Sequence, residues 1–339
     1  MKAKIAGTGS YLPSKILSNA ELEKMVETSD EWIVQRVGIF SRHIASLPHE
    51  TNVFMASEAA KKALEMSGVL PQDLDLIIIA TSTPDDAMPS TAVSVQALLG
   101  NTKAMCFDMS AACSGFIYGL SVIKQFFATG ASKKALLIGS ERMSRVIDWT
   151  DRSTCVLFGD GAGACVFTAD ENFGILSTQN HSDGRERDAL YIKGHLNSET
   201  PEFIKQAACS LPNTLQSCLD LEKDVYLHME GSRVFKSAVN MLGEVALGVL
   251  AQENLLPEDL DWLVPHQANL RIIMATAKKL NLPEEKIIIT LTHQGNTSAA
   301  SVPMALDHAV RAGKIKSGDL LLLEAFGSGF VWGAALVRY

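Results

Sequence analysis

Short apolar runs bounded by turn residues recur along the chain and predict buried β-strands. The clearest runs begin at residues 74, 134, 163, 286 and 319. Continuous apolar runs of this length are typical of strands that are covered on both faces. Stretches compatible with helices lie between them, at residues 57–67, 113–129, 234–252 and 301–312. This alternation of strands and helices predicts a layered α/β protein.

Two sequence patterns occur twice in the same order and indicate that the chain has two similar halves. The segment LPQDLDL at 70–76 returns as LPEDLDW at 256–262. Likewise, FGDGAGACVF from Phe158 resembles FGSGFVWGAALV from Phe326. One such pair alone is compatible with a common helix-to-strand turn, but both together favour duplication. We therefore predict an N-terminal half at 1–172 and a C-terminal half at 173–339.

A polar and charged stretch at about 183–224 has no counterpart in the first half. It lacks clear strand patterns, and we interpret it as an insertion with some helix of its own. Long connections of this kind lie on protein surfaces, and some of them serve as lids over a site. The sequence leaves both roles open for this insertion.

The composition predicts a soluble protein of a reducing compartment, with the cytoplasm as the simplest choice. The 30 basic and 38 acidic residues give a net charge of −8, which disfavours nucleic acid as a partner. The six cysteines form no CxxC pair, so neither a disulfide framework nor a metal site is expected. The N-terminal segment MKAKIAGTGSYLP predicts a strand and turn, and no apolar run suggests a membrane span.

One cysteine has unusually small neighbours, in the segment DMSAACSGF at 108–116. Cys113 opens the predicted helix at 113–129, and the field of a helix N-terminus lowers the pKa of a thiol. The small neighbours leave room for a thioester carbonyl and for backbone N–H donors to its oxygen. A buried, inert thiol is nevertheless the commoner role of an isolated cysteine. A nucleophilic role therefore requires polar partners from elsewhere in the chain.

Two motifs of the second half offer such partners. His266 follows a predicted strand in VPHQANLRI, and Asn296 lies in GNTSAASVP. Each also has a structural explanation, because histidines often serve as buried hydrogen-bonding groups and Gly-Asn-Thr suits a turn or helix cap. With Cys113 they suit acyl transfer by a thiolate and stabilisation of a negative oxygen. No acidic residue adjoins Cys113, His266 or Asn296 in these motifs, which favours loss of carbon dioxide over proton abstraction by a carboxylate.

These motifs, together with the terminal EAFGSGFVWGAALVRY, resemble in order those of the 3-oxoacyl-[acyl-carrier-protein] synthase III family. The resemblance extends from GTGSYLP near the N-terminus to Tyr339. It implies the thiolase fold, in which two similar halves form a five-layer αβαβα sandwich, and it implies a homodimer. It also implies an acyltransferase that initiates type II fatty acid synthesis. Such an enzyme condenses an acyl group from acyl-CoA, most simply acetyl, with malonyl-acyl carrier protein and uses no metal or bound cofactor.

The resemblance also implies roles for individual residues. Cys113 would carry the acyl group, while His266 and Asn296 would stabilise the enolate that decarboxylation produces. The backbone N–H groups of Cys113 and Ser328 would form the oxyanion hole. The positions that match CoA contacts are Trp32, Arg36, Arg152, Gly231, Phe235 and Asn269.

The same resemblance predicts a surface for the carrier protein. The residues expected to form it are Arg233, Lys236, Gln267, Ala268, Asn269, Leu270, Arg271, Lys278 and Lys279. Helical spacing supports part of this set, because Arg271 and Lys278 are seven residues apart and share one face. A basic cluster on an acidic chain can receive and orient an acidic partner, although an ordinary solvated helix face has the same appearance.

Three positions depart from the family pattern. Ser328 stands where glycine is usual, which keeps the N–H donor but strains the turn if φ is positive there. Val37 stands where threonine is common and lacks a hydroxyl for CoA. Met88 occupies the position that reaches the partner subunit's acyl pocket, where its flexibility leaves the length of the primer open.

Two alternatives share the same residues. A sister condensing enzyme would prime a secondary metabolite or a dicarboxylate with the same cysteine, histidine and asparagine. A non-catalytic scaffold of the thiolase fold is the alternative from another functional class, and the presence of all three residue types weighs against it.

Overall fold

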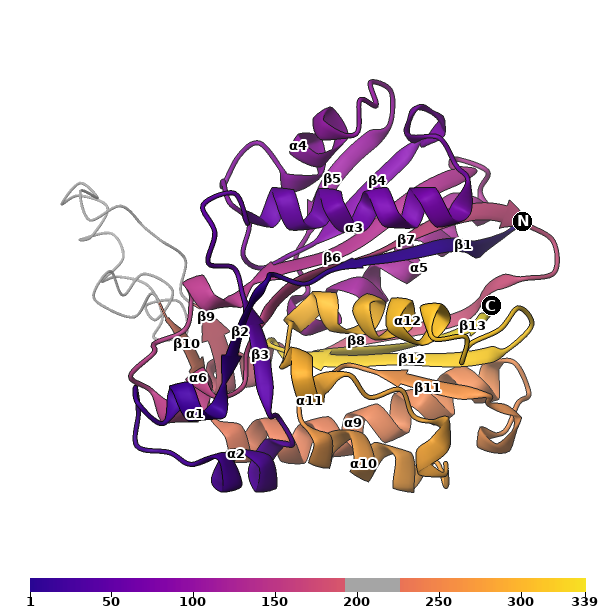
Figure 1. Cartoon of the computed structure of the whole chain (residues 1–339). Helices are drawn as coiled ribbons and strands as arrows, with labels where there is room; N and C mark the ends of the chain where they lie inside the picture. The colour runs from indigo at the N-terminus through magenta and orange to yellow at the C-terminus, as the bar shows by residue number, and fades with distance from the viewer. Residues whose placement is uncertain (193–225) are drawn as a thin grey trace, which may run out of the picture.

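The chain folds into five stacked layers (Figure 1). The structure, a computed structural model, describes residues 1–192 and 226–339. The outer layer on one side contains α3 (Asn52–Ser67) and α4 (Thr91–Leu98), and the middle layer contains α5 (Gly115–Ala128) and α12 (Ser301–Arg311). The outer layer on the other side contains α9 (Gly231–Gln252) and α10 (Leu270–Lys279). A β-sheet separates each outer layer from the middle one, which confirms the predicted αβαβα sandwich.

Among the described residues, the four strands of the second sheet follow the same order as four of the five strands of the first. The first runs β1-β7-β6-β4-β5, with bounds Lys2–Tyr11, Asp160–Asp170, Lys134–Arg142, Leu76–Ala80 and Met105–Met109. The second runs β8-β13-β12-β11, with bounds Gly174–Ser182, Val331–Arg338, Leu320–Gly327 and Trp262–Pro265. The repeated motifs occupy equivalent places, since LPQDLDL leads into β4 and LPEDLDW leads into β11. The predicted division at 172/173 lies between β7 and β8.

The strand predicted from Lys286 is wrong. Only one bridge forms in this region, between Ile287 and Leu263 of β11, and the chain then enters the short helix α11 (Leu291–Gln294). The apolar residues that suggested a strand are still buried, Ile287 and Ile288 among them. Burial without a continuous ladder produces the same sequence pattern as a strand.

Local sequence signals explain where the helices begin and end. Thr51 caps α3 through its side chain, which accepts a hydrogen bond from the Phe54 N–H, and Gly68 ends it with φ 67°. The helix thus begins five residues before the predicted start. Gly139 on β6 allows the middle layer to approach closely, because a Cβ there would lie 2.2 Å from the Ala299 carbonyl oxygen.

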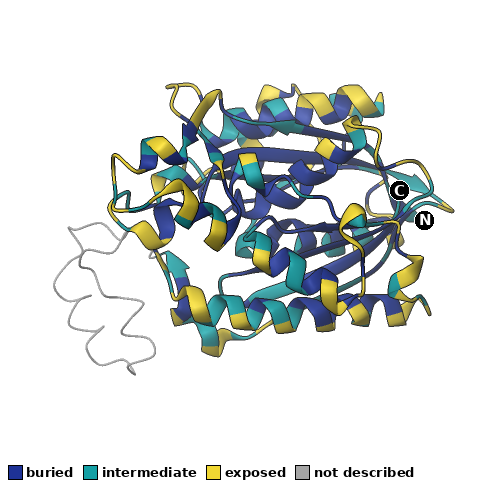
Figure 2. Cartoon of the chain, turned by 60° about the horizontal axis from the view of Figure 1, so that its bottom comes forward, coloured by how far each residue is buried: buried dark blue, intermediate teal, exposed yellow. Residues whose placement is uncertain are grey.

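The buried residues follow the layers (Figure 2). The sheets and the middle helices are mostly buried, and the exposed residues lie on the outward faces of the outer helices and in the loops. Among the described residues, α9 is the one helix whose length and composition would suit a membrane span. Its apolar face, however, packs in the core through residues that include Leu242, Val249 and Leu250. This packing is that of an amphipathic core helix.

The start of the predicted insertion is part of the described structure. Gly184–Ala189 forms a 3₁₀ helix, η4, and β9 (Leu190–Ile192) pairs antiparallel with β10 (Leu227–Met229). The rest of the insertion, 193–224, lies outside the described residues.

Candidate active site

The three predicted catalytic side chains line one cavity with a volume of about 1200 Å³. Cys113 follows β5 and precedes α5, His266 follows β11, and Asn296 follows α11. The cavity therefore lies where strands end and helices begin, the usual place for a site in an α/β sheet. Its size suits a large organic substrate.

Cys113 sits in a tight 3₁₀ turn, η2 (Ala112–Ser114), directly before α5. Ala112 has φ 45°, a conformation that non-glycine residues rarely adopt. Gly327 at the end of β12 packs against this turn, since a Cβ there would lie 2.7 Å from the Cys113 nitrogen. The small neighbours predicted to admit a substrate also allow two chain segments to meet at the thiol.

The expectation of a lowered Cys113 pKa is wrong for the free protein. Burial raises the pKa of this thiol to about 11, and the negative charge of Glu141 raises it further, while a hydrogen bond with the Ser298 side chain opposes the rise. The position before α5 does not outweigh the loss of solvation. Cys113 is therefore a protonated thiol at neutral pH and needs a proton acceptor before it can attack.

His266 is held as a neutral hydrogen-bond donor. Burial lowers its pKa to about 3. Its Nδ1 lies 2.6 Å from the Ser301 hydroxyl oxygen, which also accepts a hydrogen bond from the Gln267 N–H. In the tautomer that carries the ring proton on Nε2, Nδ1 accepts from the Ser301 hydroxyl and the Nε2–H group is free to donate.

Asn296 is oriented by two sets of contacts. Its Oδ1 accepts a hydrogen bond from the Ser298 N–H at 2.8 Å, which leaves the amide NH₂ as a donor toward the cavity. Its main chain bridges to Phe158 of the first half, through hydrogen bonds to Leu157 and from Gly159. The two halves are thus joined next to this side chain.

Ser328 lines the same cavity, and its hydroxyl donates a hydrogen bond to the Leu190 carbonyl oxygen. The strain anticipated at this position does not occur, because the positive φ of the turn, 140°, falls on Gly329. Serine in place of glycine is therefore compatible with the backbone, and the N–H group of Ser328 remains beside the cavity.

Five of the six predicted CoA contacts line the cavity, with Arg152 as the exception. Arg152 instead stacks on Trp32, with its guanidinium carbon 4.9 Å from the ring centroid, and Arg36 approaches the same ring at 5.6 Å. Asn269 caps α10 by accepting from the Arg271 N–H. Val37 lines the cavity as well.

Comparisons with known proteins decide the family. The model of 3-oxoacyl-[acyl-carrier-protein] synthase III matches residues 107–184, and the model of its C-terminal part matches 250–339. Beta-ketoacyl-[acyl-carrier-protein] synthase III of Thioalkalivibrio sulfidiphilus is 49% identical, and that of Alkalilimnicola ehrlichii is 51% identical, each alignment covering 99% of both chains. The chain belongs to the 3-oxoacyl-[acyl-carrier-protein] synthase III family.

Solved structures agree with this assignment. The synthase III of Aquifex aeolicus has a TM-score of 0.89 and 45% identity, covering 99% of this chain and 100% of that one. The priming beta-ketosynthase of the R1128 polyketide pathway has a TM-score of 0.88 and 36% identity, covering 99% and 96%. This synthase III chain is a condensing acyltransferase that initiates fatty acid synthesis, and the alternative of a sister enzyme is not favoured.

The surface predicted for the carrier protein is only partly exposed. Lys236 on α9 and Arg271, Lys278 and Lys279 on α10 are exposed next to one another. Three further predicted positions are not free on this surface. Arg233 forms ion pairs with Glu186 at 2.6 Å and with Glu230. Ala268 lines the cavity, and Leu270 packs beside Gly38.

The predicted surface role of Gln267 is wrong. This side chain is buried, donates hydrogen bonds to the carbonyl oxygens of Pro265 and Ile288, and accepts from the N–H groups of Thr290 and Leu291. It holds the segment after His266 against the turn that leads to Asn296. All of its polar atoms are engaged inside this synthase III fold, so none is left for a partner.

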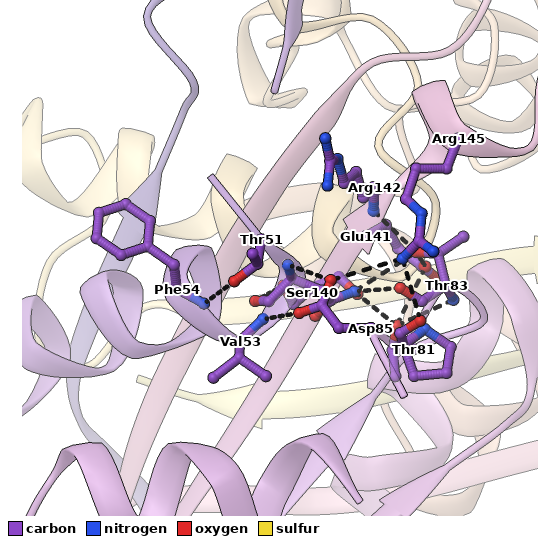
Figure 3. A network of polar contacts seen from close by, with 12 residues as sticks. Thr51, Val53, Phe54, Thr81, Thr83, Asp85, Ser140, Glu141, Arg142 and Arg145 are labelled. Atoms are coloured by element: carbon purple, nitrogen blue, oxygen red, sulfur yellow. Dashed lines mark hydrogen bonds and ion pairs between the residues drawn. The ribbon is translucent and has the colours of Figure 1, made fainter. Parts of the chain in front are cut away.

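Sequence reasoning missed a buried carboxylate behind the nucleophile. Glu141 on β6 accepts a hydrogen bond from the Thr83 hydroxyl (Figure 3). It also accepts from the Ser298 hydroxyl and from the Ser82 N–H. Burial raises its pKa to about 7. The segment LLIGSE carried a signal, since an acid within an apolar run predicted to be buried is costly unless it is hydrogen-bonded. A carboxylate therefore lies close to Cys113 in the fold although it belongs to none of the three motifs.

Proposed function

We propose that this chain takes an acyl group, most simply acetyl, from acyl-CoA onto Cys113 and condenses it with malonyl-acyl carrier protein. The products are 3-oxoacyl-acyl carrier protein, carbon dioxide and CoA. The observation that carries the proposal is the convergence of Cys113, His266 and Asn296 on one cavity that also contains Trp32 and Arg36. Acyl-CoA is a substrate in this proposal, and no cofactor is assigned.

In the first half-reaction, the Cys113 sulfur attacks the thioester carbonyl of acyl-CoA. The oxygen becomes negative in the tetrahedral intermediate, and the N–H groups of Cys113 and Ser328 stabilise it. Collapse of the intermediate breaks the bond to the CoA sulfur, and CoA leaves. The acyl group stays on Cys113 as a thioester.

In the second half-reaction, the malonyl thioester oxygen accepts hydrogen bonds from His266 Nε2–H and the Asn296 amide. Both groups are neutral donors, and they stabilise the negative oxygen of the enolate that forms when the carboxylate leaves as carbon dioxide. The enolate carbon attacks the acyl-Cys113 carbonyl, and the thiolate of Cys113 departs. No base is needed to create this carbanion, because decarboxylation supplies the electron pair.

Replacement of Trp32 by alanine tests CoA as the acyl donor. Arg152 stacks on the ring of Trp32, and an adenine bound at this ring loses its stacking contact in the variant. We expect KM for acetyl-CoA to rise about tenfold or more, because stacking of a base on an aromatic side chain is worth ~1–3 kcal/mol, and kcat to change little. Steady-state kinetics with malonyl-carrier protein held saturating measure both constants.

The control for this variant is a donor without a nucleotide, S-acetyl-N-acetylcysteamine. Its rate constants are expected to be the same for the wild type and Trp32→Ala, since it cannot reach the ring. An equal loss with both donors would mean that Trp32 supports the fold and does not bind CoA.

We further propose that the chain works as a homodimer joined along β5. This strand is at the edge of its sheet, and exposed apolar side chains cluster beside it. They are Met88 (84% exposed), Val93 (42%), Leu98 (57%) and Met105 (54%). A long apolar edge of this kind needs a partner in solution. Met88 does not line the cavity of its own chain, which is compatible with its predicted place in the partner subunit's acyl pocket.

The variant Leu98→Asp tests the dimer. A carboxylate on α4 would have to be desolvated in the proposed interface, so we expect dissociation to monomers in sedimentation velocity at micromolar concentration. Leu256→Asp is the matched control, because Leu256 is also 57% exposed but lies far from β5 in the chain, in the turn before β11. A Leu98→Asp protein that sediments like the wild type would contradict this interface.

The acidic carrier protein is proposed to dock on the cluster formed by Lys236, Arg271, Lys278 and Lys279. Arg271 connects this cluster to the cavity, since it lines the cavity and its guanidinium stacks on Phe235 at 5.2 Å. Opposite charge orients a partner more than it tightens binding. The cytoplasm is the proposed compartment, and the four cysteines among the described residues are all free thiols.

A further inference from the structure

We propose that Glu141 accepts the proton of the Cys113 thiol through the hydroxyl group of Ser298. Glu141 is then a positioning and proton-holding residue of the acyl-transfer step, since it acts through Ser298 and does not touch the substrate. The inference rests on the proposed role of Cys113 as the nucleophile.

Ser298 lies between the two groups. Its hydroxyl donates to a Glu141 carboxylate oxygen at 3.1 Å. Its turn, η7 (Ser298–Ala300), packs against η2, which carries Cys113, and its side chain lowers the pKa of the Cys113 thiol through a hydrogen bond. The Ser298 backbone has φ 51°, and its N–H donates to Asn296 Oδ1. A strained residue held by a catalytic neighbour is typical of a position selected for its side-chain direction. Ser298 lines the cavity, whereas Glu141 does not.

The hydroxyl groups around Glu141 all direct their protons at its carboxylate. The Thr83 oxygen accepts from the Arg142 N–H at 2.8 Å and donates to Glu141 at 2.5 Å. The Thr81 oxygen accepts from the Asn52 amide at 3.0 Å and donates to Glu141 at 3.3 Å. Each hydroxyl gives its one proton to Glu141 while its oxygen accepts another hydrogen bond, and donors of this kind stabilise the ionised carboxylate. The surroundings are therefore built for the ionised carboxylate.

The direction of the Cys113–Ser298 hydrogen bond follows because the Ser298 hydroxyl also has one proton. With Glu141 ionised, the single proton of Ser298 points at the carboxylate. While Cys113 is protonated, the lone pairs of the Ser298 oxygen are left for it and the thiol donates to them. Once the sulfur is ionised, the Ser298 hydroxyl stabilises the negative charge, which is why this contact opposes the rise of the Cys113 pKa. The three groups form a chain of donors from sulfur to serine oxygen to carboxylate, which is the arrangement needed for transfer of a proton in two short steps.

The charge environment leaves Glu141 free to take a proton. Its negative charge acts on Cys113, whose pKa it raises. Other charged groups on the segments next to β6 interact with each other: Asp85 with Arg145 at 3.6 Å, and Asp160 with Arg142. Burial disfavours the charged form of Glu141, and the hydrogen bonds from Ser82, Thr83 and Ser298 support it. A carboxyl group balanced in this way gains and loses a proton near neutral pH.

The balanced step is as follows. As the Cys113 sulfur bonds to the acyl carbon, its S–H bond breaks and the proton passes to the Ser298 oxygen. The Ser298 proton passes at the same time to Glu141, so the serine is unchanged and the carboxylate becomes a carboxylic acid. CoA leaves as a thiolate and takes a proton from solvent. In the condensation step, Cys113 leaves as a thiolate and recovers the proton from Glu141 by the reverse route.

The pH profile of acylation tests the inference. Single-turnover formation of acetyl-enzyme from acetyl-CoA is measured by rapid quench and intact-protein mass spectrometry, from pH ~6 to pH ~10. For the wild type we expect the rate to rise up to about pH 7 and then stay level, because the acceptor Glu141 titrates there. In Glu141→Gln the acceptor is lost, so the rate should rise about tenfold per pH unit throughout and be about 100-fold below the wild type at pH ~8.

A purely electrostatic role of Glu141 predicts the opposite. Its negative charge raises the pKa of Cys113, so removal of the charge would lower that pKa and speed acylation at every pH. A Glu141→Gln enzyme that acylates as fast as the wild type, or faster, overturns the relay. The relay is also overturned if the wild-type acylation rate keeps rising about tenfold per pH unit above neutral pH.

Variants of Ser298 keep the test decisive if Glu141→Gln fails to fold. Ser298→Ala removes the hydroxyl and keeps the strained backbone, whereas Ser298→Gly removes the hydroxyl and relaxes it. Both are expected to lose the level region of the profile equally. Retention of that region in either one contradicts the relay. Peptide mapping of the acetyl group separates this failure from failure of the proposed function, because an acetyl group on another residue overturns the role of Cys113 itself.

Discussion

The variant Cys113→Ser is expected to form no acyl-enzyme and to lose synthesis of the 3-oxoacyl product by about 10⁴-fold or more. A serine hydroxyl has a far higher pKa than a thiol, and the buried surroundings that raise the Cys113 pKa to about 11 would raise that of the hydroxyl as well. Product formation from radiolabelled acetyl-CoA and malonyl-carrier protein measures the loss.

The matched control for this prediction is Cys106→Ser. Cys106 on β5 is also a partly exposed free thiol, but it does not line the cavity. We expect this variant to retain near wild-type turnover. Substantial acylation of Cys113→Ser, or an equal loss in both variants, would show that the thiol of Cys113 is not the acyl carrier.

His266→Ala is expected to separate the two half-reactions. The histidine donates a hydrogen bond to the enolate oxygen but takes no part in attack on acyl-CoA, so acetyl-enzyme should still form. Condensation should fall by about 10²–10³-fold, the usual effect of removing one donor to a developing negative oxygen. A chase of preformed acetyl-enzyme with malonyl-carrier protein measures this step on its own.

The control for this variant is His293→Ala, because His293 is exposed, lies outside the cavity and stacks on Phe40. It should condense normally. The low pKa of His266, about 3, also predicts how condensation depends on pH, because the imidazole stays neutral above that pH. Wild-type condensation should therefore show no transition from His266 between pH ~5 and pH ~8. Loss of acylation in His266→Ala, or an unimpaired chase, would contradict the assigned role.

Much of the layered fold was predictable because its strands are buried on both faces and the chain repeats. Continuous apolar runs located β4, β6, β7 and β12, and the LPQDLDL and LPEDLDW segments located equivalent turns before β4 and β11. The apolar run from Lys286 led to a wrong strand prediction. A segment that is buried but forms one bridge has the same run of apolar residues as a strand in a full ladder. Helix starts shifted where a capping residue such as Thr51 lies outside the periodic region.

The candidate site was predictable in its motifs and not in its surroundings. Cys113, His266 and Asn296 stand out because small or polar residues flank each of them at the end of an element. Gln267 was misplaced because its neighbours in the sequence are exposed or line the cavity, while its own side chain turns inward and bonds to four backbone groups. Glu141 was overlooked because it approaches Cys113 only in three dimensions, through Ser298.

The most direct test of the account follows one acetyl group through both half-reactions by mass spectrometry. The wild-type protein mixed with acetyl-CoA should gain a single acetyl group on the peptide that contains Cys113. Addition of malonyl-carrier protein should then remove that group and yield 3-oxobutyryl-carrier protein. An acetyl group that appears on another residue, such as Cys106, or that stays on Cys113 after the chase, would contradict the claim that this cavity joins acyl transfer to decarboxylative condensation.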